Sequence, residues 1–376
     1  MSMPFPRLRA GLLCCALPLC ALPFGSASAQ ASPSSVTLYG TIDVAVEKLS
    51  NGPGPTNKPN MISGGLSGSR WGIKGSEDLG GGLNAIYTLE SGFDVSDGTL
   101  LQGGRLFGRQ AYIGLSDKSW GQLMAGRQNT LMVDWISKYN PFGNGNYSAK
   151  RVDGAFSDRA DNALKYTGKF GAFSLGALYS FGWNNDQDAE DSKVGRMYSA
   201  GVRYQQDGLD AAVLYHVKHA NKPGLNADSN NREQRLAAGL SYKTGAFQVY
   251  GGYRWLKQEL TTQNYTSNMY WAGASYQMSK PATLSLALYY LDGTTCDNLN
   301  AAACPAAQQA GKDQKPWLFV LGADYQASKR TTFYATGAYA LNRHDSSLSV
   351  IGGKFGENVN PGANQFGLNI GMRHSF

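Results

Sequence analysis

The sequence predicts an all-β chain that folds as one antiparallel barrel of sixteen transmembrane strands, with short turns at one end and long loops at the other. Apolar and polar side chains alternate over stretches of about ten residues, which is the pattern of a strand with one apolar face. The connections between these stretches are alternately short and long. After the first 30 residues there is no predominantly apolar run of about 18 residues, which excludes a helical membrane protein.

The composition agrees with a barrel whose lumen contains water. Of 376 residues, 42% are hydrophobic, 11% are aromatic and only 16% are charged, whereas roughly 25% are charged in a typical soluble domain. The aromatic content excludes a long disordered chain. The mean hydropathy of −0.33 suits strands that are apolar only at every second position, because the other positions face water.

The N-terminus predicts export. Residues 1–29 form a signal peptide, in which Arg7 and Arg9 precede an apolar run over 12–25 and small residues follow at the cleavage site. A membrane anchor is the alternative, but the run is short and two prolines interrupt it. Cleavage leaves one predicted domain, 30–376, and lowers the net charge from +7 to +5.

Sixteen segments show the alternation of a strand. In the last one, Phe366, Leu368, Ile370 and Met372 share one face, and mostly small or polar residues occupy the other. Most segments are long enough to cross the hydrocarbon core when tilted. The predicted strands are 36–48, 69–77, 83–93, 105–116, 120–128, 160–167, 172–181, 195–206, 208–218, 233–243, 246–257, 267–278, 282–292, 315–326, 331–341 and 364–376.

The lengths of the connections predict how the barrel lies in the membrane. In hydrocarbon every backbone polar group needs a partner within the protein, so the sheet must close into a barrel. Such barrels have short periplasmic turns and long outer loops. The short connections are 117–119, 168–171, 207–208, 244–245, 279–281 and 328–330. The long connections are 49–68, 94–104, 129–159, 182–194, 219–232, 258–266, 293–314 and 342–363.

The longest connection, 129–159, predicts a functional loop, because loops of this length inside a compact fold are usually functional. Its apolar residues indicate that the loop packs against other parts of the chain, and in a barrel the available space is the lumen. These apolar residues are Leu131, Met132, Trp135, Ile136 and Phe142, and they lie beside the acids Asp134, Asp153 and Asp158.

The sequence contains few candidates for catalysis. It has no nucleophile elbow, no zinc-protease motif and no phosphate-binding loop. His216 and His219 are three residues apart, so on a strand they point to opposite faces. Basic residues do not cluster with stacking aromatics, which argues against binding of nucleic acid. We therefore expect no enzymatic activity, no cofactor, no metal site and no nucleic-acid partner.

Two cysteines, Cys296 and Cys304, follow the signal peptide, and both lie in a segment rich in Asn and Ala. In an exported protein this close spacing predicts a disulfide within the loop. A metal site is the weaker alternative, because no histidine or third cysteine lies nearby in the sequence.

Several short motifs occur in a fixed order along the chain, at 35–40, 69–80, 89–93, 109–115, 126–128, 159–166 and 373–376. With these motifs the chain resembles the general porins of the Gram-negative outer membrane, in particular the trimeric sixteen-stranded type of beta-proteobacteria. The resemblance covers the whole mature chain. Each motif is weak alone, but the set in this order is specific.

The resemblance implies a homotrimer in the outer membrane, in contact with lipid and lipopolysaccharide. Each barrel would let small hydrophilic solutes and ions diffuse passively, and the third outer loop would fold inward as a constriction. The resemblance also implies that the barrel-assembly machinery recognises the terminal Phe376 as an assembly signal.

In similar porins a ladder of basic residues on the wall faces acids on the third loop. The residues carried over to this chain are Arg70, Lys74, Arg105, Arg109, Arg127 and Arg159 for the ladder, and Asp134, Asp153 and Asp158 for the loop. Arg70 and Arg159 match the motifs best. Arg109 shares a face with residues assigned to lipid, so it lies near a strand end or a bulge resets the register. The basic excess predicts a preference for anions.

Three other functions stay open. A substrate-specific channel for sugars or phosphate is the main alternative, and a sugar channel would line its neck with aromatic residues. An outer-membrane hydrolase would need a serine, a histidine and an acid on one wall, a set that the sequence lacks. A soluble adhesin or lectin has no physical reason to place its long loops at one end.

Overall fold

The structure is a computed structural model, and it describes residues 34–51, 58–185, 191–220, 230–259, 264–294, 314–343, 346–351 and 359–376. All of these belong to one compact unit, Ser32–Phe376. The signal peptide and the disulfide between Cys296 and Cys304 fall outside the described residues, so both stay predictions.

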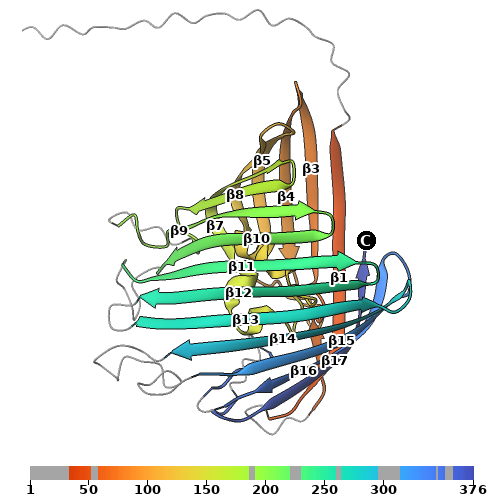
Figure 1. The fold of residues 1–376 in the computed structure, drawn as a ribbon. Coiled ribbons are helices and arrows are strands. Elements are labelled where there is room, and N and C mark those ends of the chain that lie inside the picture. Colours follow the sequence, from red (N-terminus) through yellow and green to blue (C-terminus); the bar gives the residue numbers. More distant parts are fainter. Residues whose placement is uncertain are drawn as a thin grey trace, which may run out of the picture. The chain divides into compact units, whose positions relative to one another are not determined.

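A single antiparallel sheet closes on itself to form the barrel (Figure 1). Sixteen long strands make the wall, and the short β2 (Asn60–Ser63) lies beside the second half of β1, where β3 does not reach. The long strands are β1 (Ser35–Leu49), β3 (Arg70–Gly80), β4 (Leu83–Gly92), β5 (Gln110–Asp117), β6 (Gly121–Asn129), β7 (Arg159–Phe170), β8 (Phe173–Ser180), β9 (Met197–Gln206), β10 (Leu209–His219), β11 (Arg232–Thr244), β12 (Phe247–Glu259), β13 (Asn264–Gln277), β14 (Ala282–Thr294), β15 (Trp317–Gln326), β16 (Thr331–Leu341) and β17 (Gln365–Ser375).

The last strand closes the barrel against the first one. Thr41 of β1 lies opposite Ser375 of β17, and the N–H groups of Gly40 and Phe376 each donate to the other residue's carbonyl at 3.1 Å. A Cβ on Gly40 would overlap with the ring of Phe376, so the phenyl group fills the space over this glycine. The pairing leaves no free sheet edge at the seam, which a membrane requires.

Side chains alternate between the outer face and the lumen, as the sequence predicts. In β17, Phe366 and Ile370 are exposed on the outer face, whereas Gln365 and Asn369 are buried on the inner one. Large apolar side chains are exposed on the outer face of strands around the barrel. This apolar surface suits contact with hydrocarbon, and the polar positions face a wet lumen.

Four aromatic rings stand side by side on the outer face of β12 to β15. Tyr270 lies opposite Tyr253 and Tyr290, and Tyr290 lies opposite Trp317. Neighbouring ring centres in this row are 5.2, 6.3 and 4.4 Å apart. We call these four residues the aromatic row; rows of this kind mark the boundary between hydrocarbon and headgroups in such barrels.

The connections confirm the predicted asymmetry. At one end the strands are joined by short turns; in one of them, Asp207 and Gly208 have φ values of 51° and 85°, the geometry of a two-residue hairpin turn. At the other end lie the long connections. One of these is shorter than predicted, because β12 continues to Glu259 and β13 begins at Asn264.

One predicted strand begins too early. The prediction placed it at 105–116, but β5 begins at Gln110. Gln102, Gly103 and Gly104 have positive φ values of 54°, 76° and 77°, a conformation that turns the chain away from the sheet. Arg105 therefore lies in the second outer loop. Arg109 directly precedes β5. Of the two explanations for its face, the position near a strand end is therefore the one that the structure shows.

The helical turns of the described residues all lie in the third outer loop. They are α1 (Leu131–Asp134) and the 3₁₀ turns η1 (Ile136–Lys138), η2 (Ala149–Arg151) and η3 (Gly154–Ser157). Among the described residues, no helix is both long and apolar enough to cross a bilayer.

Candidate functional site

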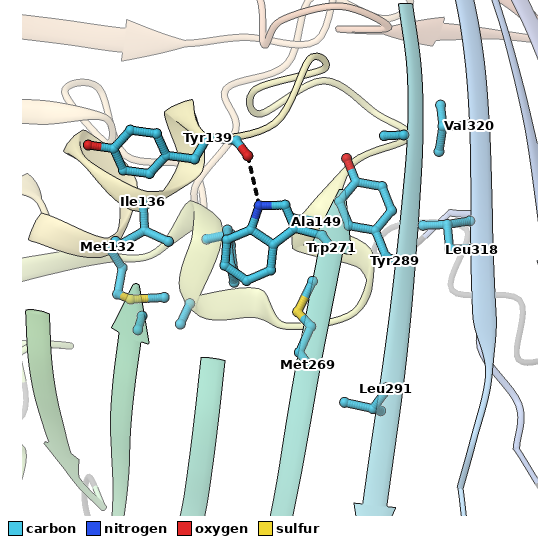
Figure 2. Close-up of a cluster of buried hydrophobic side chains, with 14 of the residues drawn as sticks. Met132, Ile136, Tyr139, Ala149, Met269, Trp271, Tyr289, Leu291, Leu318 and Val320 are labelled. Carbon is cyan, nitrogen blue, oxygen red and sulfur yellow. Dashed lines mark hydrogen bonds between the residues drawn. The ribbon is translucent and has the colours of Figure 1, made fainter. Parts of the chain in front are cut away.

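The third outer loop, 130–158, folds into the lumen and packs against the wall. Figure 2 shows Met132, Ile136 and Tyr139 of the loop beside Trp271 of the wall, within one cluster of buried apolar side chains. The indole Nε1 of Trp271 donates to the carbonyl of Tyr139 at 2.7 Å. The apolar residues that the sequence places in this loop thus attach it to the wall through a buried apolar contact inside a water-filled barrel.

Asp153 fixes the second half of the loop to the wall. Its carboxylate lies 3.0 Å from Nε of Arg235 on β11 and 2.8 Å from Nε of Arg254 on β12, and it accepts the N–H of Ala155. All three charged side chains are buried. Burial alone would raise the pKa of Asp153, but the two guanidinium groups outweigh it and hold that pKa far below its usual range. The loop therefore carries an ionised anchor.

The other two predicted loop acids also pair with cations of the wall. Asp134 lies 2.8 Å from Nζ of Lys165 on β7, and Asp158 lies 2.6 Å from Nζ of Lys218 on β10. None of the cations that pair with the three acids belongs to the predicted basic ladder. The ion pairs of these acids hold the loop in place along β7 to β12.

The tip of the loop is tied to the opposite part of the wall. Glu47 of β1 accepts hydrogen bonds from the hydroxyl of Tyr147 at 2.7 Å and from the amide of Asn146 at 2.9 Å. Burial and the nearby carboxylate of Glu47 raise the pKa of Tyr147, so this hydroxyl stays protonated and keeps donating. The loop thus crosses the lumen from one side to the other.

A cavity of about 810 Å³ lies between this loop and the wall. We call it the neck. No aromatic side chain is found among the described residues that line it. Five basic and three acidic side chains line it, namely Arg70, Arg109, Lys150, Arg151 and Arg159, and Glu47, Glu90 and Asp94.

Glu90 orders two of the arginines on the neck. One carboxylate oxygen lies 2.6 Å from Nε of Arg109, and the other lies 3.6 Å from Nε of Arg70. Arg159 differs, because none of the ion pairs between described residues includes it and its buried Nε has no hydrogen-bond partner there. Its positive charge is thus less compensated than that of Arg109.

Next to the neck, Asp161 of β7 joins two more arginines. It lies 2.8 Å from Nη1 of Arg105 in the second outer loop and 2.5 Å from Nη1 of Arg127 on β6. The carboxylate links the second outer loop to the wall and balances part of this charge.

Lys150 brings a further positive charge from the third loop to the neck. Its Nζ donates to the carbonyl of Asn144 at 2.9 Å. Burial and the guanidinium groups of Arg151, Arg109 and Arg159 lower the pKa of Lys150 to about 7. The charge on this amine is therefore present in mildly acidic solution and is lost as the pH rises through neutrality.

Asp43 of β1 holds the first outer loop against the neck. Its carboxylate accepts the N–H groups of Gly65, Leu66 and Ser67 at 3.0, 3.1 and 2.7 Å. It also accepts the hydroxyl of Tyr334 at 2.6 Å. Leu66 and Ser67 line the neck, so Asp43 positions part of its rim.

The structure brings most of the predicted basic ladder together. Arg70, Arg109 and Arg159 line the neck, and Arg105 and Arg127 lie beside it at Asp161.

Lys74 lies apart from this group. It is exposed, with its Nζ 5.4 Å from the ring centre of Tyr39, and it does not line the neck. Sequence reasoning missed Glu90 and Lys150. An acid at a lumen position of a transmembrane strand was the available signal for Glu90, whereas Lys150 lies in an irregular loop without a periodic pattern.

A profile of the Gram-negative porin family matches residues 17–345. The chain belongs to this family. An outer membrane porin protein of Bordetella pertussis is 33% identical to the porin, over 95% of the porin and 98% of its own length. Outer membrane porin protein 32 of Delftia acidovorans is 28% identical, over 94% of the porin and 96% of its own length.

Solved structures show the same barrel. The anion-selective porin from Comamonas acidovorans superposes with a TM-score of 0.76 at 26% identity, over 92% of the porin and all of that chain. OmpT of Vibrio cholerae, described in a trimer form, has a TM-score of 0.65 at 16% identity, which shows the fold alone. The family, the relatives and the barrel assign the porin to the outer membrane of a Gram-negative bacterium.

Proposed function

We propose that the porin is a water-filled channel for passive diffusion of small hydrophilic solutes, and that its neck prefers anions. The observation that carries this proposal is the charge on the neck, where five basic side chains face three acidic ones. The neighbouring group of Arg105, Arg127 and Asp161 adds one more positive charge. The similarity to a solved anion-selective porin supports the same preference.

The mechanism is electrostatic. In a narrow neck with low-dielectric walls, fixed charges of one sign attract ions of the other sign and repel those of their own. An anion that approaches the neck gains from Arg159 and Lys150, whose charges no described carboxylate neutralises directly. The remaining polar side chains hydrate neutral solutes, so their passage depends on size.

Reversal potentials across planar bilayers in a salt gradient test this proposal. We expect the native porin to conduct anions in preference to cations, and we expect Arg159→Ala to reduce this preference. One unit charge at about 4 Å from an ion in water contributes about 1 kcal/mol, or roughly a five-fold change for each ion sign. Lys118→Ala, in a periplasmic turn, is the matched control. A cation preference in the native porin would refute the proposal.

A phosphate-specific channel is the second candidate, and the basic neck favours it over a sugar channel. A sugar channel needs an aromatic slide, and the described lining of the neck contains none. Titration with phosphate separates the two candidates. A saturable block of chloride current at low phosphate would indicate a specific site, whereas conductance that rises in proportion to ion concentration supports general diffusion.

We further propose that three porin chains form a homotrimer in contact with lipid and lipopolysaccharide, without enzymatic activity. In support, a structural neighbour is described in a trimer form, and the chain belongs to a porin family and shares its fold with a solved porin. Light scattering of the detergent-solubilised porin tests the trimer, and a monomeric mass would contradict it. Phe376 would serve as the assembly signal; a Phe376→Ala chain that inserts at the native rate would contradict that role.

A further inference from the structure

The amine of Lys150 has a fixed position on the neck. Lys150 lies in the turn η2, directly after Ala149, which is buried in the apolar cluster between the third loop and the wall (Figure 2). The side chain of Lys150 is partly buried and lines the neck. Its Nζ donates a hydrogen bond to the carbonyl of Asn144 at 2.9 Å. The turn and this hydrogen bond therefore hold the amine at the edge of a water-filled cavity.

Most of the charged groups around this amine are cations. The guanidinium groups of Arg151 in the same loop, of Arg109 before β5 and of Arg159 on β7 all act on Lys150. The carboxylate that acts on it is that of Asp43 on β1, and none of the ion pairs between described residues includes Lys150. The other charged residues that line the neck are Arg70 on β3, Glu90 on β4, Glu47 on β1 and Asp94 in the second outer loop.

These surroundings favour the neutral form of the amine. Burial and the three guanidinium groups lower the pKa of Lys150 to about 7. About half of such amines are neutral at pH 7, compared with fewer than roughly one in a thousand for an ordinary lysine. A neutral amine has a free electron pair and can act as a nucleophile, which an ammonium group cannot. The same guanidinium groups that repel the ammonium form would attract a negative charge at this position.

The neck also contains a donor for such a negative charge. Arg159 takes part in none of the ion pairs between described residues, and its buried Nε has no hydrogen-bond partner among them. A carboxylate can accept two parallel hydrogen bonds from one guanidinium. The cavity of about 810 Å³ has room for a carboxylate, because one water molecule occupies only about 30 Å³ in the liquid.

We propose that Nζ of Lys150 reacts reversibly with dissolved carbon dioxide to form a carbamate, and that Arg159 binds the new carboxylate. The electron pair of the neutral amine forms a bond to the carbon of carbon dioxide, and one electron pair of a C=O bond moves to oxygen. The nitrogen then releases one proton to water, so the step needs no oxidant or reductant. The carbamate nitrogen keeps one hydrogen, which can still donate to the carbonyl of Asn144.

The carbamate would regulate the charge of the neck. It replaces a neutral or positive group with a negative one at Lys150, so it should lower the preference for anions. This inference rests on the anion preference proposed above, and it adds a modification site that controls it. At pH 8 the amine is mostly neutral, and its conversion changes the charge by one unit, which corresponds to roughly a five-fold lower preference.

Chemical trapping on the full mature porin in detergent tests the site directly. The porin is incubated at pH 8 in ¹³C-labelled bicarbonate, which is in equilibrium with dissolved carbon dioxide. Triethyloxonium then converts any carbamate into a stable ethyl ester, and mass spectrometry locates the label. We expect the label at Lys150 and only traces at Lys118 and Lys243, which are exposed at the periplasmic end of the barrel.

Two arginine substitutions test the role of Arg159 in this reaction. Arg159→Gln should lower the labelling of Lys150 by at least about ten-fold, because the carbamate loses a charged hydrogen-bond donor and the amine becomes easier to protonate. Arg330→Gln is the matched control, since Arg330 is exposed in a periplasmic turn, and it should leave the labelling unchanged. Equal labelling of Lys150 in Arg159→Gln would remove Arg159 from the site.

Reversal potentials test the effect on selectivity, at pH 8 and constant ionic strength, with and without bicarbonate. The anion preference of the native porin should fall by about five-fold when bicarbonate is present. Lys150→Arg keeps a positive charge but cannot form the carbamate, so its preference should not change. Both channels carry the same bicarbonate ions, so the difference between them reports the modification.

An unlabelled Lys150 would overturn the proposal, and equal labelling of Lys118 would show general reactivity instead of a site. An equal shift of the reversal potential in Lys150→Arg would assign the effect to bicarbonate in the pore and would remove the regulation. Trapping does not depend on conductance, so its outcome is separate from that of the proposed function. A cation preference of the native porin without bicarbonate would refute that function, whatever the labelling shows.

Discussion

The substitution Asp153→Asn should release the third loop from the wall. Asp153 is the carboxylate shared by Arg235 and Arg254, and all three side chains are buried. Removing one partner of a buried ion pair costs roughly 3–5 kcal/mol, because a charge is left without compensation. Arg235 keeps its second carboxylate partner, Glu233 at 2.8 Å, so we take the lower end, about 3 kcal/mol.

This loss applies to a local opening rather than to unfolding of the barrel, because the strand pairing is unchanged. A loss of about 3 kcal/mol raises the population of the released loop by about 100-fold, at about 1.4 kcal/mol for each factor of ten. The released loop would expose Lys150 and Arg151, which are partly buried in the folded loop, to trypsin, and single channels would show frequent transient changes of current. Limited proteolysis and bilayer recordings measure both effects.

Asp207→Asn is the matched control, since Asp207 is an exposed acid in a periplasmic turn. It removes the same charge, and it should leave the loop resistant to trypsin and the single-channel current free of added fluctuations. The alternative role for Asp153, an acid that faces the permeating ion, makes the opposite prediction. If the Asp153→Asn channel shows no added current fluctuations, resists trypsin and has a stronger anion preference, Asp153 does not anchor the loop.

Three further predictions follow from single contacts. Because the pKa of Lys150 is about 7, the anion preference should fall by up to about five-fold as the pH rises through neutrality. Lys150→Met should abolish that change. A reversal potential of the native porin that is independent of pH would contradict this prediction. Asp43→Asn weakens about two hydrogen bonds to a carboxylate, each worth about 1.5–3 kcal/mol, so amides of the first loop should exchange hydrogen faster, and unchanged exchange contradicts the role. Gly40→Val would collide with the ring of Phe376 and should lower the temperature at which the barrel unfolds in SDS; Gly337→Ala, where the nearest atom is 3.8 Å away, should not.

The sequence was sufficient to predict the barrel because each transmembrane strand repeats the same physical constraint. An outward position must be apolar and a lumen position can be polar, so 331–341 was predicted with the bounds of β16. The strand predicted at 105–116 begins too early, because this constraint does not apply to the loop before Gln110. Gln102 to Gly104 turn the chain through positive φ values, and polar residues of the loop continue the alternation by chance.

The site was less predictable than the fold. Ladder residues on strands, such as Arg70 and Arg159, lie in motifs that a linear pattern can show. Lys150 and Asp153 lie in an irregular loop, where no periodicity says which wall a side chain reaches. Their surroundings depend on packing of the loop across the lumen, which brings Asp153 to β11 and β12 and brings Lys150 to the neck.

The charge of the neck is a consequence of how this loop crosses the lumen. Its acids, Asp134, Asp153 and Asp158, are neutralised by cations of β7 to β12, while Lys150 and Arg151 point to the neck on the other side. The loop thus separates its charges across the lumen. A chain with a small net positive charge can in this way form a neck with an excess of basic side chains, because its loop acids are neutralised by cations away from the path of the ions. Selectivity and loop position are therefore coupled, and a variant that releases an acid anchor should change both.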